Sequence, residues 1–167
     1  EEPMKRLRFL SIFTVIALTL MLLPVRVARA AEICGQYDTI AVMGGQYIVQ
    51  NNVWGATTTQ CVNVPDTNAT AFSVSRSDHN QSSVAAYPSI FKGCHWGTCT
   101  TNSGMPIRVS QVTSAPFSWS ITTISSGTWN AAAEAWFSPT TDSSNGYNGG
   151  AELMIWLDYR GMQPSGS

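Results

Sequence analysis

Charged residues are scarce in this chain of 167 residues, at 11% of the sequence against about 25% in an ordinary globular protein. The nine basic and ten acidic residues nearly cancel, and no basic stripe runs through the body of the chain. Nucleic-acid-binding proteins show such a stripe, so the sequence argues against this class. Intrinsic disorder is equally disfavoured, because 44% of the residues are apolar and the net charge is small.

Lys and Glu, two of the residues that are common in helices, are also few, whereas Ser, Thr, Asn, Gly, Val and aromatic residues are abundant. This mixture is typical of β-sheets and their turns. At this length the chain accommodates one domain, and no internal repeat or linker divides it.

The N-terminal segment has the pattern of a signal peptide. A basic group (Lys5, Arg6, Arg8) precedes an uncharged run over residues 9–25, and Ala28-Arg29-Ala30 provides a small-residue cleavage site. A membrane-spanning helix of about 20 apolar residues is the competing interpretation, but Pro24 and the cleavage site favour removal after Ala30. We therefore expect residues 1–30 to be leader and signal peptide, and residues 31–167 to be an exported domain with four basic and eight acidic residues.

Four cysteines agree with export and predict two disulfides. Three pairings are possible, and the short spacing from Cys94 to Cys99 favours a local clip, which leaves Cys34 to pair with Cys61. A metal site built on Cys94, His95 and Cys99 is the weaker alternative, since zinc sites use closely spaced cysteine pairs with matching partners elsewhere.

Alternating apolar residues and turn signals predict short strands throughout. The stretch at 127–137 is ambiguous, because its alanines favour a helix on propensity, but Trp129, Trp136 and Phe137 favour a strand. A turn-rich loop follows at 139–150. The predicted architecture is all-β, a sandwich or jelly roll. The expected strands are Tyr37–Val42, Gln46–Gln50, Phe72–Arg76, Ile107–Val112, Phe117–Ile121, Gly127–Phe137 and Ala151–Tyr159.

The last of these strands carries the most informative pattern. One face is aliphatic, while strict alternation places Glu152, Met154, Trp156 and Asp158 on the other face. A carboxylate beside an aromatic ring suits a sugar-binding sheet, in which the ring stacks on a pyranose and the carboxylate acts at the anomeric carbon. An ordinary solvent-exposed edge strand is the simpler alternative.

Several motifs, in order along the chain, resemble glycoside hydrolase family 12, the small bacterial and fungal endo-β-1,4-glucanases and xyloglucanases. The resemblance extends from about Cys34 to the last residue, and it implies a β-jelly-roll sandwich of two curved antiparallel sheets with a concave substrate cleft. It also implies a retaining mechanism with two glutamates, no metal and no cofactor, and the two disulfides match the bacterial branch. The motifs are Asn51–Gly55, Tyr87–Phe91 leading into Gly93–His95, Trp129–Ala132, Glu152–Leu157 and Gln163–Ser167.

The resemblance assigns roles position by position. Glu152 corresponds to the family's nucleophile, and Glu134 replaces an aspartate that hydrogen-bonds to the nucleophile. The residues that correspond to substrate-binding positions are Asn52, Trp54, His95, Trp96, Met154 and Trp156. His79 is interpreted as an ordinary loop histidine.

A retaining glycosidase also needs a second carboxyl group about 5–5.5 Å from the nucleophile, as general acid/base. In the family this glutamate lies well beyond the nucleophile, whereas the chain ends fifteen residues after Glu152. Asp158 cannot replace it, because six residues of strand span about 20 Å. We therefore expect the N-terminal portion of an enzyme, without its general acid and inactive alone.

The predicted function is that of a secreted endo-β-1,4-glucanase acting on cellulose, mixed-linkage glucan or xyloglucan. We expect a monomer with no nucleic-acid partner and no stable membrane association after signal cleavage. A non-catalytic jelly-roll carbohydrate-binding module that stacks sugars on Trp54, Trp96 and Trp156 is the alternative.

Overall fold

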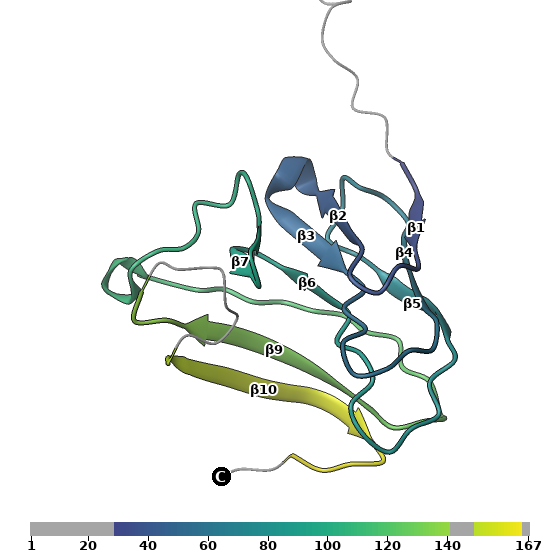
Figure 1. Cartoon of the computed structure of the whole chain (residues 1–167). Coiled ribbons are helices and arrows are strands. Elements are labelled where there is room, and N and C mark those ends of the chain that lie inside the picture. Colours follow the sequence, from purple (N-terminus) through teal and green to yellow (C-terminus); the bar gives the residue numbers. More distant parts are fainter. Residues whose placement is uncertain (1–28, 141–148, 165–167) are drawn as a thin grey trace, which may run out of the picture.

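A computed structural model describes residues 29–140 and 149–164 of the protein. Most of the expected leader therefore lies outside the described residues, as does most of the expected loop at 139–150. The described chain consists of ten strands and two short 3-10 turns, η1 and η2 (Figure 1). No helix within it is long and apolar enough to cross a membrane.

Two small antiparallel sheets form the packed part of the molecule. One has the order β1-β4-β5 and the other β2-β3-β6. In chain order the bounds are β1 Ala31–Ile33, β2 Thr39–Val42, η1 Met43–Gly45, β3 Tyr47–Gln50, β4 Gln60–Val64, β5 Ser73–Ser77 and β6 Ser89–Phe91.

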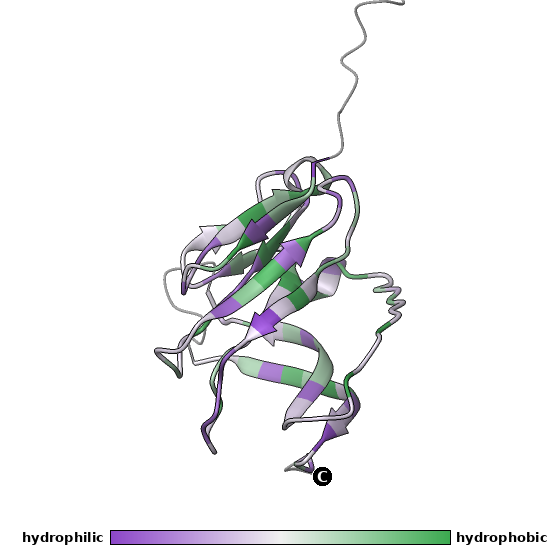
Figure 2. Ribbon diagram, turned by 90° about the vertical axis from the view of Figure 1, so that its right-hand side faces the viewer, coloured by the Kyte–Doolittle hydropathy of each residue, from purple (hydrophilic) through white to green (hydrophobic). Residues whose placement is uncertain are grey.

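The core lies between these two sheets. Val42 and Val49 from one sheet pack with Val62 and Val64 from the other, and all four are fully buried. Partly buried residues such as Ile33 and Phe72 surround them. Figure 2 shows apolar segments, in green, on the strands in the upper part of the molecule.

Two separate hairpins complete the described fold. The small one pairs β7 (Cys94–His95) with β8 (Thr98–Cys99). The η2 turn (Val109–Gln111) follows, and then the long hairpin of β9 (Trp129–Phe137) and β10 (Ala151–Arg160). This long hairpin curves below the two packed sheets (Figure 2).

The prediction of an all-β fold is confirmed, including the strand at 129–137 despite its alanines. The predictions of strands at 107–112 and 117–121 are wrong. These segments contain η2 and irregular chain, and side chains such as Val109 and Phe117 are more than 60% exposed. Strand propensity alone does not form a strand, because the backbone N–H and C=O groups also need a neighbouring strand.

A β-bulge in the long hairpin overturns one part of the predicted face pattern. Trp156 pairs with Ala132, but the next pair is Asp158 with Ala131, so Leu157 is an extra residue without a partner in the register. The bulge moves Asp158 to the aliphatic face of the hairpin. Tyr159 takes its place beside Trp156, and the two ring centroids are 5.8 Å apart.

Both disulfides have the pairing that the sequence favours. Cys34 is bonded to Cys61, which ties the segment after β1 to β4. Cys94 is bonded to Cys99 across the β7–β8 hairpin, in which these two residues are register partners.

Candidate active site

The long hairpin brings four of the expected site residues onto one face. Glu152 lies opposite Trp136, Met154 lies opposite Glu134, and Trp156 lies opposite Ala132. The two glutamates are diagonal neighbours, a relation that lets long side chains on adjacent strands touch. Sequence reasoning predicted that Glu134 could approach Glu152 across a hairpin.

The Glu134 carboxyl is electrostatically unusual. Burial, then the charge of Glu152 and a hydrogen bond with the Glu152 carboxyl, raise the pKa of Glu134 from 4.5 to about 7, while a hydrogen bond from the Trp136 side chain opposes this shift. Its Oε1 atom is buried and has no hydrogen-bond partner among the described residues. A protonated Glu134 can therefore donate a hydrogen bond to a carboxyl oxygen of Glu152.

The same face continues as a row of aromatic and sulfur-containing side chains. The Trp156 indole Nε1–H donates a hydrogen bond to Met154 Sδ at 2.8 Å, which fixes the orientation of the indole ring. Tyr159, brought to this face by the bulge, contacts the Trp156 ring and is 46% exposed. Tyr159 was missed in the sequence because a bulge leaves no clear signal in a strictly alternating pattern.

His95 and Trp96 lie at the tip of the small hairpin. Trp96 and Gly97 form its two-residue loop, with φ angles of +48° and +82°. This left-handed pair is the turn that two-residue hairpins favour, but it is unusual for a residue as large as tryptophan. The conformation exposes 61% of Trp96, while His95 beside it is half-buried and contacts the Phe91 ring.

Asn52 and Trp54 lie on the loop after β3, on either side of the buried residue Val53. The Val53 N–H donates to Gln36 O at 2.8 Å, and the Gln36 amide donates back to Val53 O at 2.7 Å. Trp54 is 55% exposed as a result, and the side-chain amide of Asn52 makes no hydrogen bond with the described part of the chain.

A buried hydrogen-bond network, also missed in the sequence, holds the base of this loop. Asn51 donates to Gln60 O at 2.9 Å, and Gln60 Nε2 donates to Asn51 Oδ1 at 2.9 Å. His79 contacts Gln60 Oε1 at 3.2 Å through Nε2 and Thr58 Oγ1 at 2.7 Å through Nδ1. His79 is therefore an anchor of the loop that carries Trp54, rather than an ordinary loop histidine.

The expected site residues thus form three groups: the hairpin face, the β7–β8 tip and the loop after β3. Within the described chain, no hydrogen bond or ring contact of Asn52, Trp54, His95 or Trp96 reaches the hairpin face. Gln50 is the link between the second and third groups, since it precedes the Asn51–Gly55 loop and contacts His95.

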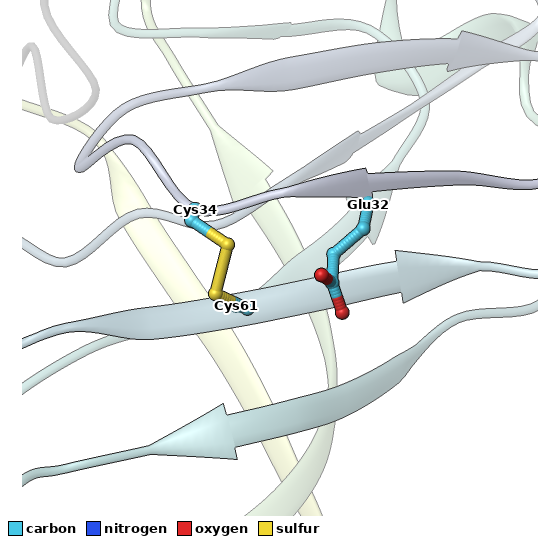
Figure 3. Close-up of side chains that lie close together, drawn as sticks. All are labelled: Glu32, Cys34 and Cys61. Carbon is cyan, nitrogen blue, oxygen red and sulfur yellow. A yellow bond between two sulfur atoms is a disulfide. The ribbon is translucent and has the colours of Figure 1, made fainter.

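One cluster of potential metal ligands occurs among the described residues, formed by Glu32, Cys34 and Cys61. The two sulfurs are bonded to each other and so offer no thiolate (Figure 3). Glu32 accepts a hydrogen bond from Ser75 Oγ at 2.6 Å. The alternative metal site at Cys94, His95 and Cys99 loses its thiolates in the same way.

A carboxyl group with a supporting carboxyl beside it, on a sheet face that carries exposed aromatic rings, fits the class of the glycoside hydrolases. Comparison of the sequence with known protein families identifies the family within this class. Residues 45–167 match glycosyl hydrolase family 12, and the chain belongs to this family.

Similar proteins include two glucanases. The chain is 34% identical over 154 residues to "Endoglucanase S" of Pectobacterium parmentieri, which covers 87% of this chain and 57% of that protein. It is 28% identical over 147 residues to "Xyloglucan-specific endo-beta-1,4-glucanase A" of Emericella nidulans, with 78% and 52% covered.

The fold matches solved structures of the same family. The endoglucanase Cel12A from Rhodothermus marinus superposes with a TM-score of 0.77 at 52% identity, covering 82% of this chain and 61% of that one. A metagenome-derived family 12 endoglucanase superposes with a TM-score of 0.74 at 47% identity, covering 83% and 61%. The chain therefore spans between about half and three fifths of the length of the relatives that it matches.

Proposed function

We propose that the whole protein is a secreted endo-β-1,4-glucanase that cleaves β-glucan internally and with retention of anomeric configuration. The observation that carries this proposal is the carboxylate pair of Glu152 and Glu134 on the aromatic face of the hairpin, in a family 12 chain. The names of the relatives support β-1,4-glucans, including xyloglucan, as the substrate class.

In this proposal Glu152 is the nucleophile that attacks the anomeric carbon and forms the glycosyl-enzyme. Glu134 is its supporting carboxyl. With a pKa of about 7, a protonated Glu134 can donate a hydrogen bond to Glu152, which orients the nucleophile without adding a second negative charge beside it.

The general acid/base must be another carboxyl group. Asp158 is unsuitable, because it lies six residues along β10 and, through the bulge, on the opposite face from Glu152. Glu134 is already hydrogen-bonded to the nucleophile as its neighbour. Because the chain spans only about half to three fifths of the length of its relatives, we propose that the acid/base lies in the part of the whole protein that this sequence does not include.

The substrate-binding residues in the proposal offer two kinds of contact. Trp54 and Trp96 present exposed indole rings on which pyranose faces can stack, and Trp156 and Met154 form the floor beside Glu152. Asn52 and His95 supply hydrogen bonds to hydroxyl groups. We propose that the sheets belong to a jelly roll whose concave side holds this cleft.

We also propose that the protein is exported from the cytoplasm. Residues 1–30 are leader and signal peptide, and the secreted domain from residue 31 functions as a monomer. The two disulfides support an oxidising compartment outside the cytoplasm.

The test is an assay of the whole protein on barley β-glucan, carboxymethylcellulose and xyloglucan, with the product anomer followed by proton NMR. The proposal predicts internal cleavage and a first-formed β-anomer. A first-formed α-anomer would contradict the retaining mechanism. Tight glucan binding without hydrolysis would support the carbohydrate-binding alternative instead.

A further inference from the structure

Gln50 is a polar residue in an unusually buried place. It ends β3, the central strand of its sheet, where it pairs with Thr39 of β2 and with Ser89 of β6. Only 6% of the residue is exposed. A buried amide is costly unless its hydrogen bonds are satisfied, so its partners reveal what it does.

The Gln50 amide joins three elements. Its Nε2 atom lies 3.1 Å from Ser89 Oγ on β6 and 3.1 Å from His95 Nδ1 on β7. Its Oε1 atom is slightly farther from the same ring nitrogen, at 3.3 Å. The amide nitrogen has two hydrogens, so it can donate to Ser89 and to His95 at once.

The shorter contact, between Gln50 Nε2 and His95 Nδ1, favours one tautomer of His95 over the Nδ1–H form, which would donate to Gln50 Oε1. When Nδ1 accepts the hydrogen bond from Gln50 Nε2, the proton of a neutral His95 lies on Nε2. Nε2 has no hydrogen-bond partner among the described residues. Burial lowers the pKa of His95 and so favours the neutral ring. The Phe91 ring at 5.8 Å and the Trp96 ring at 6.4 Å pack around it.

We propose that Gln50 is a positioning residue, which holds His95 as the Nε2–H tautomer so that the ring offers a hydrogen-bond donor to a glucan hydroxyl. The choice of a glucan as the ligand rests on the proposed function, but the tautomer is a property of the free protein. It assigns a substrate-related role to a residue that touches no sugar itself.

The experiment records the nitrogen-15 spectrum of the histidine side chains in the whole protein, with the His95 signals assigned by their loss in His95→Gln. We expect the Nε2–H pattern in the wild type. Gln50→Glu places a carboxylate at His95 Nδ1, which should move the proton to Nδ1 or charge the ring. Gln50→Leu, which introduces no buried charge, should leave a mixture of tautomers. The control Gln46→Glu changes the charge at an exposed site on the same hairpin and should leave the pattern unchanged.

Cello-oligosaccharide kinetics on the same variants test the consequence. Loss of one oriented donor should raise KM by about 2- to 10-fold in Gln50→Leu, with a smaller change in kcat. An Nδ1–H tautomer in the wild type, unchanged spectra in both Gln50 variants, or a changed tautomer with unchanged KM would each overturn the inference. Absence of hydrolysis by the wild type would instead refute the proposed function, while the spectra would still decide the tautomer.

Discussion

The two glutamates of the hairpin face differ in the part that we assign to each. For Glu152→Gln in the whole protein, we expect turnover of natural glucans to fall by at least about 10⁴-fold, because an amide cannot form the glycosyl ester. Binding of cello-oligosaccharides should persist, since the side chain keeps its shape. Calorimetric titration and initial rates measure the two quantities. Asp158→Asn is the control and should change little, because it lies on the other face.

Glu134 should make stability depend on pH. Its pKa is about 7 in the folded protein and about 4.5 when unfolded, so the folded state binds more protons between these values. The free energy of unfolding should therefore fall as the pH rises from about 4.5 through 7. Urea unfolding across this range should show the fall in the wild type, and Glu134→Gln should flatten it. Glu134→Asp keeps a carboxyl group and should retain part of the slope; an unchanged slope in Glu134→Gln would contradict this assignment.

Trp96 combines an unfavourable backbone conformation with an exposed indole. Asparagine tolerates positive φ better than tryptophan, so Trp96→Asn should stabilise the protein by up to about 1 kcal/mol. The same change should weaken glucan binding, because a stacking ring is lost. Trp54→Asn is the matched control, since Trp54 does not have positive φ, and it should weaken binding without the gain in stability. Thermal unfolding and affinity electrophoresis in β-glucan gels measure both effects.

Among the elements, the two disulfides constrain loops of different length. Cys34–Cys61 spans a sequence separation of 27, and Cys94–Cys99 spans 5. The chain-entropy relation gives a stabilisation of about 3.6 kcal/mol for the first and about 2 kcal/mol for the second. Denaturant unfolding of the two double Cys→Ser variants should show this order. A larger loss of stability on removal of Cys94–Cys99 would indicate that this disulfide acts mainly through native contacts in the small hairpin. Its effect on the entropy of the unfolded chain would then be the smaller contribution.

The sequence predicted those elements that carry their own signal. The alternating and aromatic segments at 39–50, 73–77, 129–137 and 151–160 formed strands, and the cysteine spacing favoured the observed pairing. The segments at 107–112 and 117–121 have similar local patterns but lack strand partners in the described chain. The bulge at Leu157, and with it the exchange of Asp158 for Tyr159, depends on cross-strand register, which no local pattern encodes.

The candidate site was less predictable from the sequence than the strands were. Family motifs indicated Glu152, Asn52 and Trp54. Asn51 lies within one of these motifs, but the motif does not indicate its buried hydrogen bonds, and Gln50 and Gln60 lie outside the motifs. The hydrogen bonds of Gln50, Gln60 and Asn51 form only when the elements that carry their partners are packed together. Their roles follow from burial and distance, which a single sequence does not contain.

Among the described residues, nothing covers the aliphatic face of the long hairpin. Leu153 and Ile155 are each at least half exposed in the described chain.

We expect residues 31–167, expressed alone, to show no glucanase activity, since loss of a general acid alone costs about 10²–10⁴-fold. Reducing-sugar release from barley β-glucan measures it, with the whole protein as the positive control. Comparable hydrolysis by both would show that the acid/base lies within these residues.

In the mechanism that we propose, Glu152 forms a covalent bond with the sugar. A mechanism-based 2-deoxy-2-fluoro cellobioside traps this intermediate on the whole protein, because the fluorine slows its hydrolysis, and peptide mass analysis then locates the label. We predict one label per molecule, on Glu152, and none in Glu152→Gln. A label on Glu134 or on any other residue, or no covalent adduct in an active enzyme, would show that Glu152 is not the nucleophile.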